Sequence, residues 1–532
     1  MSEGAEWIYY NGEIISMDEK NAIYEAIAIK EEKIVALGKF AELKKWSDSN
    51  TIFVDLEGKT VLPGLIDAHQ HLFHSGFNLF YIHCSHPSIK EMVEAMNIKA
   101  KELQPDEWII GWGYDEAKLQ EGRHPETTDF KDITNPIYIS RYCEHTAVVN
   151  QTVLHLMKLT KETKAKNGEI VRNSSGEAIG ILKEEAMNLA KKVMPAYTKE
   201  QMKKAIKLAI NKNLSNGITS VHDAGLGFFS DSFEQEYTVL KEMAENKELS
   251  IRIYGMVLEK FFQKAIKKQQ EEHSYFRIGA MKLFADGTIS GKTAAVSIDY
   301  NETDHSGMLL YTEAELTEKV MVAHKLGCQI AIHAIGDRAV EQVIKAYDKA
   351  LQTYPRSNHR HRIEHSMITN KALLRKMKVL EIIPILQPTL VYQAGDVYQE
   401  NLDSTLVSQV FAAKKMMDHQ LSPAGSSDAP ITPFSPFFAM YAAMSRRTQR
   451  GKVLAPENKI TLDEALKMYT INAARASFDE ANKGTLEVGK LGDMTIVPPG
   501  FMQFEENEIK DTKVVMTIIG GEIMYRRGQE NE

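Results

Sequence analysis

The middle of the chain alternates short apolar runs with longer stretches of helical periodicity. The apolar runs are rich in β-branched residues and are bounded by turn formers, which is typical of buried strands. The stretches between them, such as residues 313–326 and 337–350, repeat apolar side chains at helical spacing. The predicted strands are 62–71, 218–222, 251–257, 278–284, 329–333, 362–365, 382–386 and 424–428. Eight strands that alternate with helices favour an α/β fold, the closed (β/α)8 barrel of the TIM type.

Residues 77–205 are predicted to form an inserted domain over the mouth of this barrel. The chain between the first and second strands is far longer than a βα connection needs. It contains elements of its own, namely predicted strands at 108–110 and 137–140 and predicted helices at 87–103 and 198–214. The barrel itself is predicted to span residues 58–479, with the large insertion after its first strand.

Both ends of the chain carry short β patterns separated by turn residues. Asn11-Gly12 is a hairpin signal near the N-terminus, and Gly484 and Gly489 flank a similar run near the C-terminus. We predict that residues 1–57 and 480–532 together form one small β-sandwich domain.

Two histidines end the first predicted barrel strand, in the segment VLPGLIDAHQH. Alternate residues of a strand point to the same face, so His69 and His71 are expected to point the same way. Such a pair offers a metal ion two ligands from one rigid element. A His-x-His pair alone also occurs by chance, so the other strand ends decide its meaning.

Three more candidate ligands close other predicted strands. His333 ends the fifth strand, His365 ends the sixth and Asp428 ends the eighth. The carboxyl ends of barrel strands surround one mouth, where active sites are built. Four histidines and one aspartate at four strand ends therefore predict a metal site in preference to scattered core histidines.

Further polar residues near these strand ends have open interpretations. Lys282, in the apolar fourth strand, either carries a carbamate that bridges two metal ions or is a charged lysine paired with Asp286 or Asp428. Asp286 is in phase with Lys282 if the strand continues, and it is a candidate either for contact with the substrate or for support of a metal ligand. His222 is expected to end the second strand and to face the mouth, where it either bonds a substrate carbonyl as a catalytic residue or caps the strand.

Charge and cysteine content narrow the class of partner. The chain has 64 basic and 72 acidic residues, so its net charge of −8 gives no general attraction to nucleic acid or anionic membranes. Its N-terminus is acidic where a secretory signal would be basic, and its apolar runs are too short to span a bilayer. Three cysteines, Cys84, Cys143 and Cys328, are too few for a disulfide framework or a Cys-rich zinc site. We expect a cytoplasmic protein that acts on a small molecule.

The segments around these residues resemble the amidohydrolase superfamily of metal-dependent hydrolases. Within it, the chain is similar to the branch of N-substituted formamide deformylases and YtcJ-like proteins, amidohydrolase family 3. Besides the His69/His71 strand, the matching segments are GITSVHDAG, MKLFADGTISGKTA, IHAIGDRA, HRIEH, GSSDAP, TINAARA and GTLEVGKLGDMTIV. The resemblance covers nearly the whole chain, and it also suggests a homodimer.

The resemblance implies a role for each candidate residue. His69 and His71 would ligate the more buried metal ion together with Asp428, and a carboxylated Lys282 would bridge to a second ion at His333 and His365. The superfamily varies in metal count, so a site with one ion stays open. In the insertion, the residues that match the branch and are expected to line the substrate pocket are Trp112, Tyr114, Arg141 and His145.

These groups predict hydrolysis of an amide-type C–N bond. A divalent ion lowers the pKa of a bound water from 15.7 towards about 7, which makes hydroxide available at neutral pH. Asp428 would act as general base and then return the proton to the leaving nitrogen. Zinc suits imidazole and carboxylate donors, although iron or manganese accepts the same set. The alternatives are deamination of a ring, opening of a cyclic amide and a non-catalytic scaffold, the last disfavoured because all five ligand residues are retained.

Overall fold

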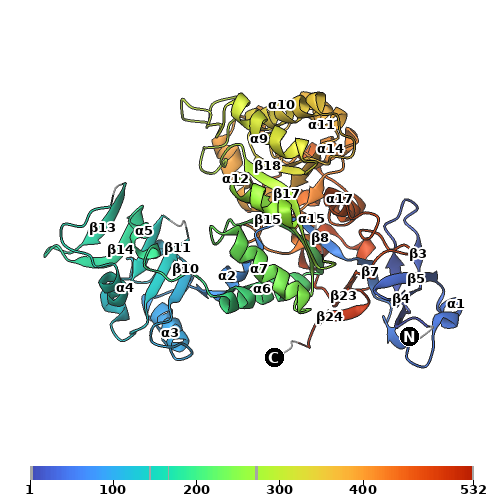
Figure 1. Cartoon of the computed structure of the whole chain (residues 1–532), viewed down its shortest axis with the longest axis horizontal. Coiled ribbons are helices and arrows are strands. Elements are labelled where there is room, and N and C mark those ends of the chain that lie inside the picture. Colours follow the sequence, from blue (N-terminus) through green and yellow to red (C-terminus); the bar gives the residue numbers. More distant parts are fainter. Residues whose placement is uncertain (1–3, 143–144, 166, 270–272, 530–532) are drawn as a thin grey trace. The chain divides into compact units, whose positions relative to one another are not determined.

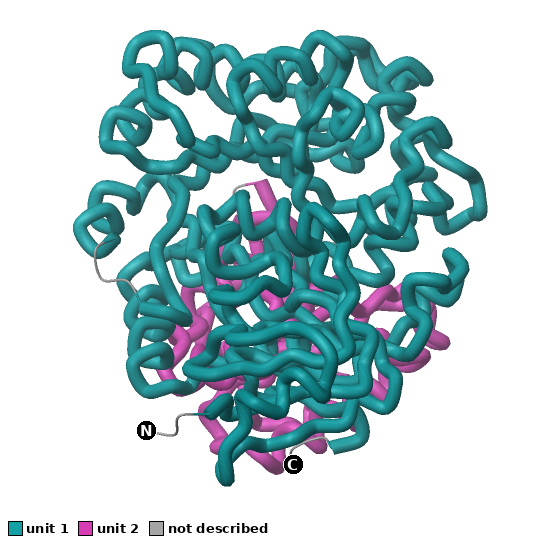
Figure 2. Tube along the Cα trace, turned by 90° about the vertical axis from the view of Figure 1, so that its right-hand side faces the viewer, with its two compact units in different colours: residues 1–72, 209–532 teal, residues 73–208 magenta. Residues whose placement is uncertain are grey.

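The computed structural model describes residues 4–142, 145–165, 167–269 and 273–529. The chain forms two compact units, residues 1–72 with 209–532 and residues 73–208 (Figure 2). Of the three cysteines, Cys84 and Cys328 are free thiols, and Cys143 lies outside the described residues.

Eight parallel strands form a barrel in the first unit. Their order in the sheet follows the chain: β8 (Leu65–Gln70), β15 (Ile218–Leu226), β16 (Arg252–Leu258), β17 (Phe276–Phe284), β18 (Ile330–Ala334), β19 (Arg362–His365), β20 (Ile383–Leu386) and β21 (Ala424–Gly425). The last strand meets the first through two backbone bonds, from Asp428 N to His69 O (2.8 Å) and from His71 N to Ala429 O (2.9 Å). The predicted α/β barrel is confirmed.

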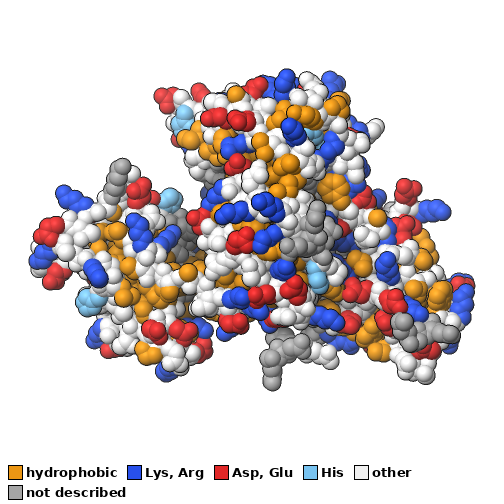
Figure 3. Space-filling view, viewed as in Figure 1, with side chains coloured by type: hydrophobic (Ala, Val, Ile, Leu, Met, Phe, Trp, Pro, Cys, Tyr) orange, Lys and Arg blue, Asp and Glu red, His pale blue; other side chains and the backbone are white. Residues whose placement is uncertain are grey.

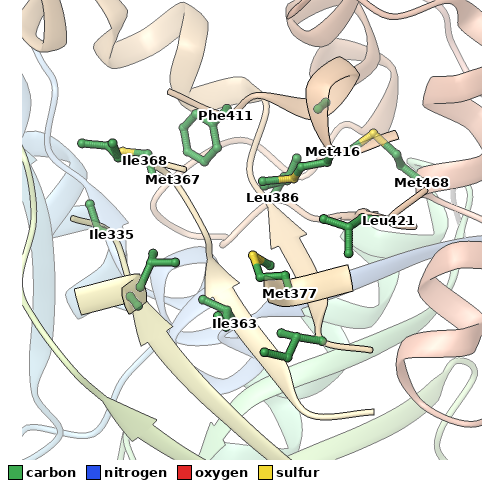
Figure 4. Close-up of a cluster of buried hydrophobic side chains, with 14 of the residues drawn as sticks. Ile335, Ile363, Met367, Ile368, Met377, Leu386, Phe411, Met416, Leu421 and Met468 are labelled. Atoms are coloured by element: carbon green, nitrogen blue, oxygen red, sulfur yellow. The ribbon is translucent and has the colours of Figure 1, made fainter. Parts of the chain in front are cut away.

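Helices pack against the outside of these strands (Figure 1). They include α7 (Phe233–Glu245), α9 (Glu313–Lys325), α10 (Asp337–Thr353), α11 (Lys371–Val379), α12 (Thr389–Asn401) and α15 (Pro436–Ser445). A capping box at Thr312 and Glu315 starts α9, because the Thr312 hydroxyl accepts the Glu315 N–H. Figure 4 shows part of the apolar layer, in which strand residues Ile363 and Leu386 lie near Met377 of α11.

Two further sheets of the first unit share one core and are built from both ends of the chain. One has the order β5-β4-β1-β6 and the other β24-β23-β22-β7-β2-β3. The bounds are β1 (Trp7–Tyr10), β2 (Glu13–Ile15), β3 (Ile23–Tyr24), β4 (Ala26–Lys30), β5 (Lys33–Gly38), β6 (Ile52–Asp55), β7 (Thr60–Pro63), β22 (Met494–Val497), β23 (Met516–Ile519) and β24 (Glu522–Arg526). Buried side chains from both sheets, among them Ile27 and Met494, form a single apolar cluster.

The second unit has its own six-stranded sheet, in the order β13-β14-β12-β11-β10-β9. The strands are β9 (Ile82–His83), β10 (Ile109–Tyr114), β11 (Ile137–Arg141), β12 (Thr146–Val149), β13 (Gly168–Arg172) and β14 (Ala178–Glu184). Its helices include α3 (Ile89–Ala100), which begins at Ser88, whose side chain accepts the Glu91 N–H. Buried apolar residues form separate clusters here, so this unit has a core of its own.

Acidic and basic side chains are interspersed over the face shown in Figure 3. In the described ranges, no helix combines the length and the apolar character needed to cross a bilayer.

Three buried histidines form a hydrogen-bonded group away from the strand ends that carry the candidate ligands. His324 Nδ1 lies 2.9 Å from His361 Nε2, and His324 Nε2 donates to Tyr354 O at 2.7 Å. His361 Nδ1 accepts the Ile330 N–H at 3.1 Å. His359 Nε2 donates to a backbone carbonyl, and its Nδ1 accepts the His361 N–H. Every ring nitrogen of the three histidines therefore has a hydrogen-bond partner when the imidazoles are neutral.

We predict that this histidine group makes the protein less stable in mild acid. Burial lowers the pKa of His359 to about 4 and holds that of His361 well below its usual value. The unfolded chain takes up these protons near pH 6.5, so it binds more protons than the folded chain between about pH 6.5 and 4. Above about pH 6.5 these histidines therefore do not lower the free energy of unfolding. As the pH falls below that value the free energy of unfolding decreases, by about 2 kcal/mol for one such histidine at pH 5.

The measurement is the thermal unfolding midpoint at pH 7.5 and at pH 5. His361→Asn keeps one donor and one acceptor but cannot be protonated, so its midpoint should fall less over this interval. An equal fall in the variant and the unchanged protein would contradict the assignment.

Candidate metal centre

The five predicted ligands meet at the carboxyl ends of the barrel strands. His69 belongs to β8 and His71 follows it, His333 lies in β18, His365 ends β19, and Asp428 follows β21. The ring centroids of His69 and His71 are 5.6 Å apart, those of His69 and His365 are 5.0 Å apart, and those of His333 and His365 are 4.4 Å apart. Four separate strands thus bring these side chains to one place.

Three of these residues form a tight donor set. One ligand atom from each of His69, His365 and Asp428 lies within 4.8 Å of the others, and all three residues are buried. Asp428 Oδ1 is 3.4 Å from His69 Nε2 and 3.3 Å from His71 Nε2. This oxygen is buried and has no hydrogen-bond partner among the described residues. A buried carboxylate oxygen without a donor is costly unless a cation compensates it, so the donor set fits a metal ion.

Hydrogen bonds to the far side of each ring fix which nitrogen faces this donor set. The Nδ1 of His69 bonds the Glu364 carboxylate, and His365 Nδ1 donates to Gln387 Oε1 at 2.8 Å. His333 instead uses Nε2, which donates to Gly287 O at 3.0 Å. Among the described residues, these bonds leave Nε2 of His69 and His365 and Nδ1 of His333 available to a metal ion. Metal-binding histidines are held in this way, with the other ring N–H on a carboxylate, an amide or a backbone carbonyl.

Burial and charge leave three of these groups, His333, His365 and Asp428, in the forms that bind metals. Burial lowers the pKa of His333 to about 4 and that of His365 well below its usual value, so both rings are neutral at pH 7. Burial would raise the pKa of Asp428, but its interactions with His69 and His71 outweigh burial and hold that pKa well below its usual value. Neutral imidazoles beside an ionised carboxylate are suitable ligands for zinc.

Two of the candidate ligands have left-handed backbone conformations. The φ angle is 68° at His365 and 59° at Asp428. For residues other than glycine this conformation costs about 1–2 kcal/mol, and such strain is concentrated at functional sites. Asp428 lies three residues beyond the regular end of β21, so the irregular segment 426–428 carries it to the mouth.

Lys282 is buried in β17, with 1% of its surface exposed. Burial lowers its pKa to about 8, although the charges of Glu364 and Asp428 act in the opposite direction. Its Nζ lies 5.1 Å from the centroid of the Phe284 ring. In the part of the chain that the structure describes, it forms no ion pair with Asp286 or Asp428, so the charged pair considered as an alternative is not formed.

Asp286 holds the loop that follows His333. Its carboxylate accepts the N–H groups of Ile335 (3.0 Å), Gly336 (2.8 Å) and Ala295 (3.0 Å). A Cβ at Gly336 would lie 2.0 Å from Ala295 O, so only glycine fits there. Both carboxylate oxygens thus bind backbone donors around His333, in line with a supporting role, and the predicted contact with substrate stays a prediction.

His222 does not lie at a strand end. β15 continues for four residues beyond it, to Leu226, so the predicted strand end at His222 is wrong, while its predicted catalytic role stays a prediction. The imidazole is fully buried, and its Nδ1 accepts from Arg362 Nη1 at 3.0 Å. All residues of β15 that follow His222 are buried.

The family model described as the amidohydrolase family matches residues 53–525. The chain belongs to this family. It is 26% identical to YtcJ of Bacillus subtilis over 98% of this chain and 99% of that protein. It is 27% identical to the N-substituted formamide deformylase of Arthrobacter pascens over 99% of both chains. A metal-dependent hydrolase from Pyrococcus horikoshii OT3 superposes with a TM-score of 0.79 at 27% identity, covering 94% of this chain and 99% of that chain.

These matches confirm the predicted family and branch, and they confirm that this amidohydrolase is a hydrolytic enzyme. They also agree with the predicted dependence on a metal ion, since the Pyrococcus protein is named as a metal-dependent hydrolase.

The four predicted substrate contacts of the insertion lie in the second unit of this amidohydrolase. Trp112 Nε1 donates to Asn78 O at 3.2 Å, and buried Tyr114 has its hydroxyl 3.0 Å from His124 Nδ1. Arg141 pairs with Glu116 at 2.5 Å, and exposed His145 has its Nδ1 3.0 Å from Glu184 Oε2. These contacts are all within the unit, and the predicted substrate role of the four residues stays a prediction.

Glu364 and Gln387 were missed in the sequence of this amidohydrolase, although each bonds a candidate ligand. A signal was present in HRIEH, where two charged residues, Arg362 and Glu364, alternate in a strand whose residues are all buried. Charged residues are almost never fully buried unless they are paired. Gln387 directly follows β20 and carried no comparable signal.

Proposed function

We propose that this amidohydrolase hydrolyses an amide-type C–N bond with Asp428 as general base and general acid. The observation that supports the proposal most strongly is the buried Asp428 Oδ1 beside the Nε2 atoms of His69 and His71. These three residues would hold one divalent ion, and when bound the ion would supply an acidified water and polarisation of the scissile carbonyl.

The residues of the chain then have distinct tasks. Asp428 takes a proton from the attacking water and later gives it to the leaving nitrogen, because an amide nitrogen leaves poorly as an anion. His365, whose ligand atom lies within 4.8 Å of those of His69 and Asp428, and His333 offer further donors. Lys282, whose pKa is about 8, has an appreciable neutral fraction at pH 7 to 8, and only the neutral amine forms a carbamate. We propose it as the bridge to a second ion, and zinc as the metal.

The proposed substrate class rests on the chemistry of the site and on one of its named relatives. An N-substituted formamide deformylase that aligns over the full length favours an N-formyl or N-acyl amine as substrate. Ring deamination and the opening of a cyclic amide would use the same groups and are the competing reactions.

The test is elemental analysis of the purified protein, followed by a hydrolysis screen of N-formyl amines, N-acyl amines and cyclic amides. We expect bound zinc, loss of turnover after dialysis against a chelator and its return on adding zinc. Two ions per chain would support the bridging role of Lys282, and one would favour a single-ion site. Ammonia release from amino-substituted rings without amide hydrolysis would favour deamination, and metal-free protein without turnover would contradict the proposal.

A further inference from the structure

A network of buried polar side chains leads from the interior of the barrel to the candidate metal centre. It runs from His222 of β15 through Arg362 and Glu364 of β19 to His69 of β8. The first three residues have 0% of their surface exposed, and His69 has 1%. None of the first three belongs to the donor set, and the proposed reaction assigns them no step.

Arg362 lies at the centre of this network, and each nitrogen of its guanidinium group donates a hydrogen bond. Its Nε donates to Glu364 Oε1 at 2.8 Å and its Nη2 to Glu364 Oε2 at 2.9 Å. Nη2 also donates to Ala68 O at 2.6 Å, and Nη1 donates to His222 Nδ1 at 3.0 Å. A planar guanidinium that binds a carboxylate through two parallel bonds fixes the plane of that carboxylate.

Glu364 transmits this orientation to the metal ligand. Its Oε2 bonds His69 Nδ1, so Nδ1 carries the proton and Nε2 keeps its lone pair towards Asp428. Arg362 acts on His69 from both sides, since it also holds the carbonyl of Ala68, the residue before it. The ring orientation and the main chain of this ligand therefore depend on one guanidinium.

Stability alone does not account for such a pair. A fully buried ion pair is often no more stabilising than apolar side chains of similar volume, because both ions lose their hydration. His222 adds a further cost, because its Nε2 is buried and has no hydrogen-bond partner within the described ranges. Burying this group therefore costs free energy, while the bonds of Arg362 to Glu364 and Ala68 and of Glu364 to His69 all hold His69 in place.

We propose that Glu364, Arg362 and His222 are positioning residues that set the metal affinity of the site through His69. This inference rests on the proposed metal site and assigns its supporting residues. The effect should decrease with distance from the ligand, so that Glu364 matters most, Arg362 less and His222 least.

The experiment measures zinc affinity of the full chain by chelator competition, without substrate. Glu364→Gln removes the carboxylate and should weaken zinc binding about 10–100-fold, as loss of such a partner typically does. Glu364→Asp, which keeps the charge, should restore part of the affinity. The visible spectrum of the cobalt-loaded protein should shift in Glu364→Gln, because the orientation of a ligand imidazole changes.

Glu364→Gln also leaves Arg362 buried without its partner, so a second variant separates folding from positioning. The double variant Arg362→Met, Glu364→Gln removes both charges and should unfold near the temperature of the unchanged protein, yet bind zinc as weakly as Glu364→Gln. The matched control is Arg446→Met, since Arg446 is equally buried but donates to the carbonyls of Leu454, Phe411 and Val410. It should lower the unfolding temperature and leave zinc affinity unchanged.

Two results would overturn the inference. One is unchanged zinc affinity in Glu364→Gln, and the other is recovery of both stability and zinc affinity in the double variant. Failure of the proposed function is distinguishable, because the unchanged protein would then bind no metal at all.

Discussion

Asp428→Asn is expected to lower kcat for amide hydrolysis by about 10²–10⁴-fold, the usual contribution of a general acid–base residue. Asn keeps an oxygen directed at His69 and His71, but it cannot accept and return a proton at neutral pH. Metal content should therefore stay near that of the unchanged protein. The measurement is steady-state hydrolysis of the best N-formyl or N-acyl amine, combined with elemental analysis of the same preparation.

The control for this variant is Asp396→Asn. Asp396 is also a buried aspartate, but its carboxylate accepts from Thr448 Oγ1 and the Arg450 N–H, which belong to a surface loop. It should reduce stability without reducing kcat per folded molecule. Full activity in Asp428→Asn would remove the proposed role of Asp428.

The second large effect is expected from His69→Ala combined with His71→Ala, which should reduce bound metal to the level of chelator-treated protein. These residues supply both Nε2 atoms next to Asp428 Oδ1, so their loss leaves the carboxylate without its companion donors. Elemental analysis after desalting is the measurement. Turnover should disappear together with the metal.

His155→Ala serves as the comparison, because His155 is an exposed histidine of the second unit. It should retain metal and activity. Unchanged metal content in the double variant would show that the ligand assignment is wrong.

The barrel could be predicted from sequence because its strands are strongly apolar and sharply bounded. The sixth strand was predicted at 362–365 and β19 has those limits, while the fifth differs from β18 by one residue at each end. The strand ends then indicated which histidines would converge. The convergence of these histidines follows from the fold class alone, because the parallel strands of a barrel all end at one mouth.

The supporting residues could not be predicted in the same way. Glu364 and Arg362 lie inside a strand, and their pairing with His69 depends on the closure of the ring between β21 and β8, hundreds of residues away in sequence. The second strand was predicted to end at His222, whereas β15 extends to Leu226 with every residue buried, an extension that depends on tertiary packing. The backbone conformation of Asp428 also has no sequence signal, since it is imposed by the segment after β21.

The sheet that contains both termini has a consequence for biosynthesis. β7 pairs with β22, and Gly64 N, between β7 and β8, donates to Asp493 O at 2.8 Å. A nascent chain that has not yet emerged past residue 493 therefore lacks the neighbour of the strand that leads into His69. Contacts between such distant segments form late. We expect the metal ion to be taken up only after residues 494–497 have emerged from the ribosome and paired with β7, so that cellular metal supply acts on molecules in which this sheet has formed.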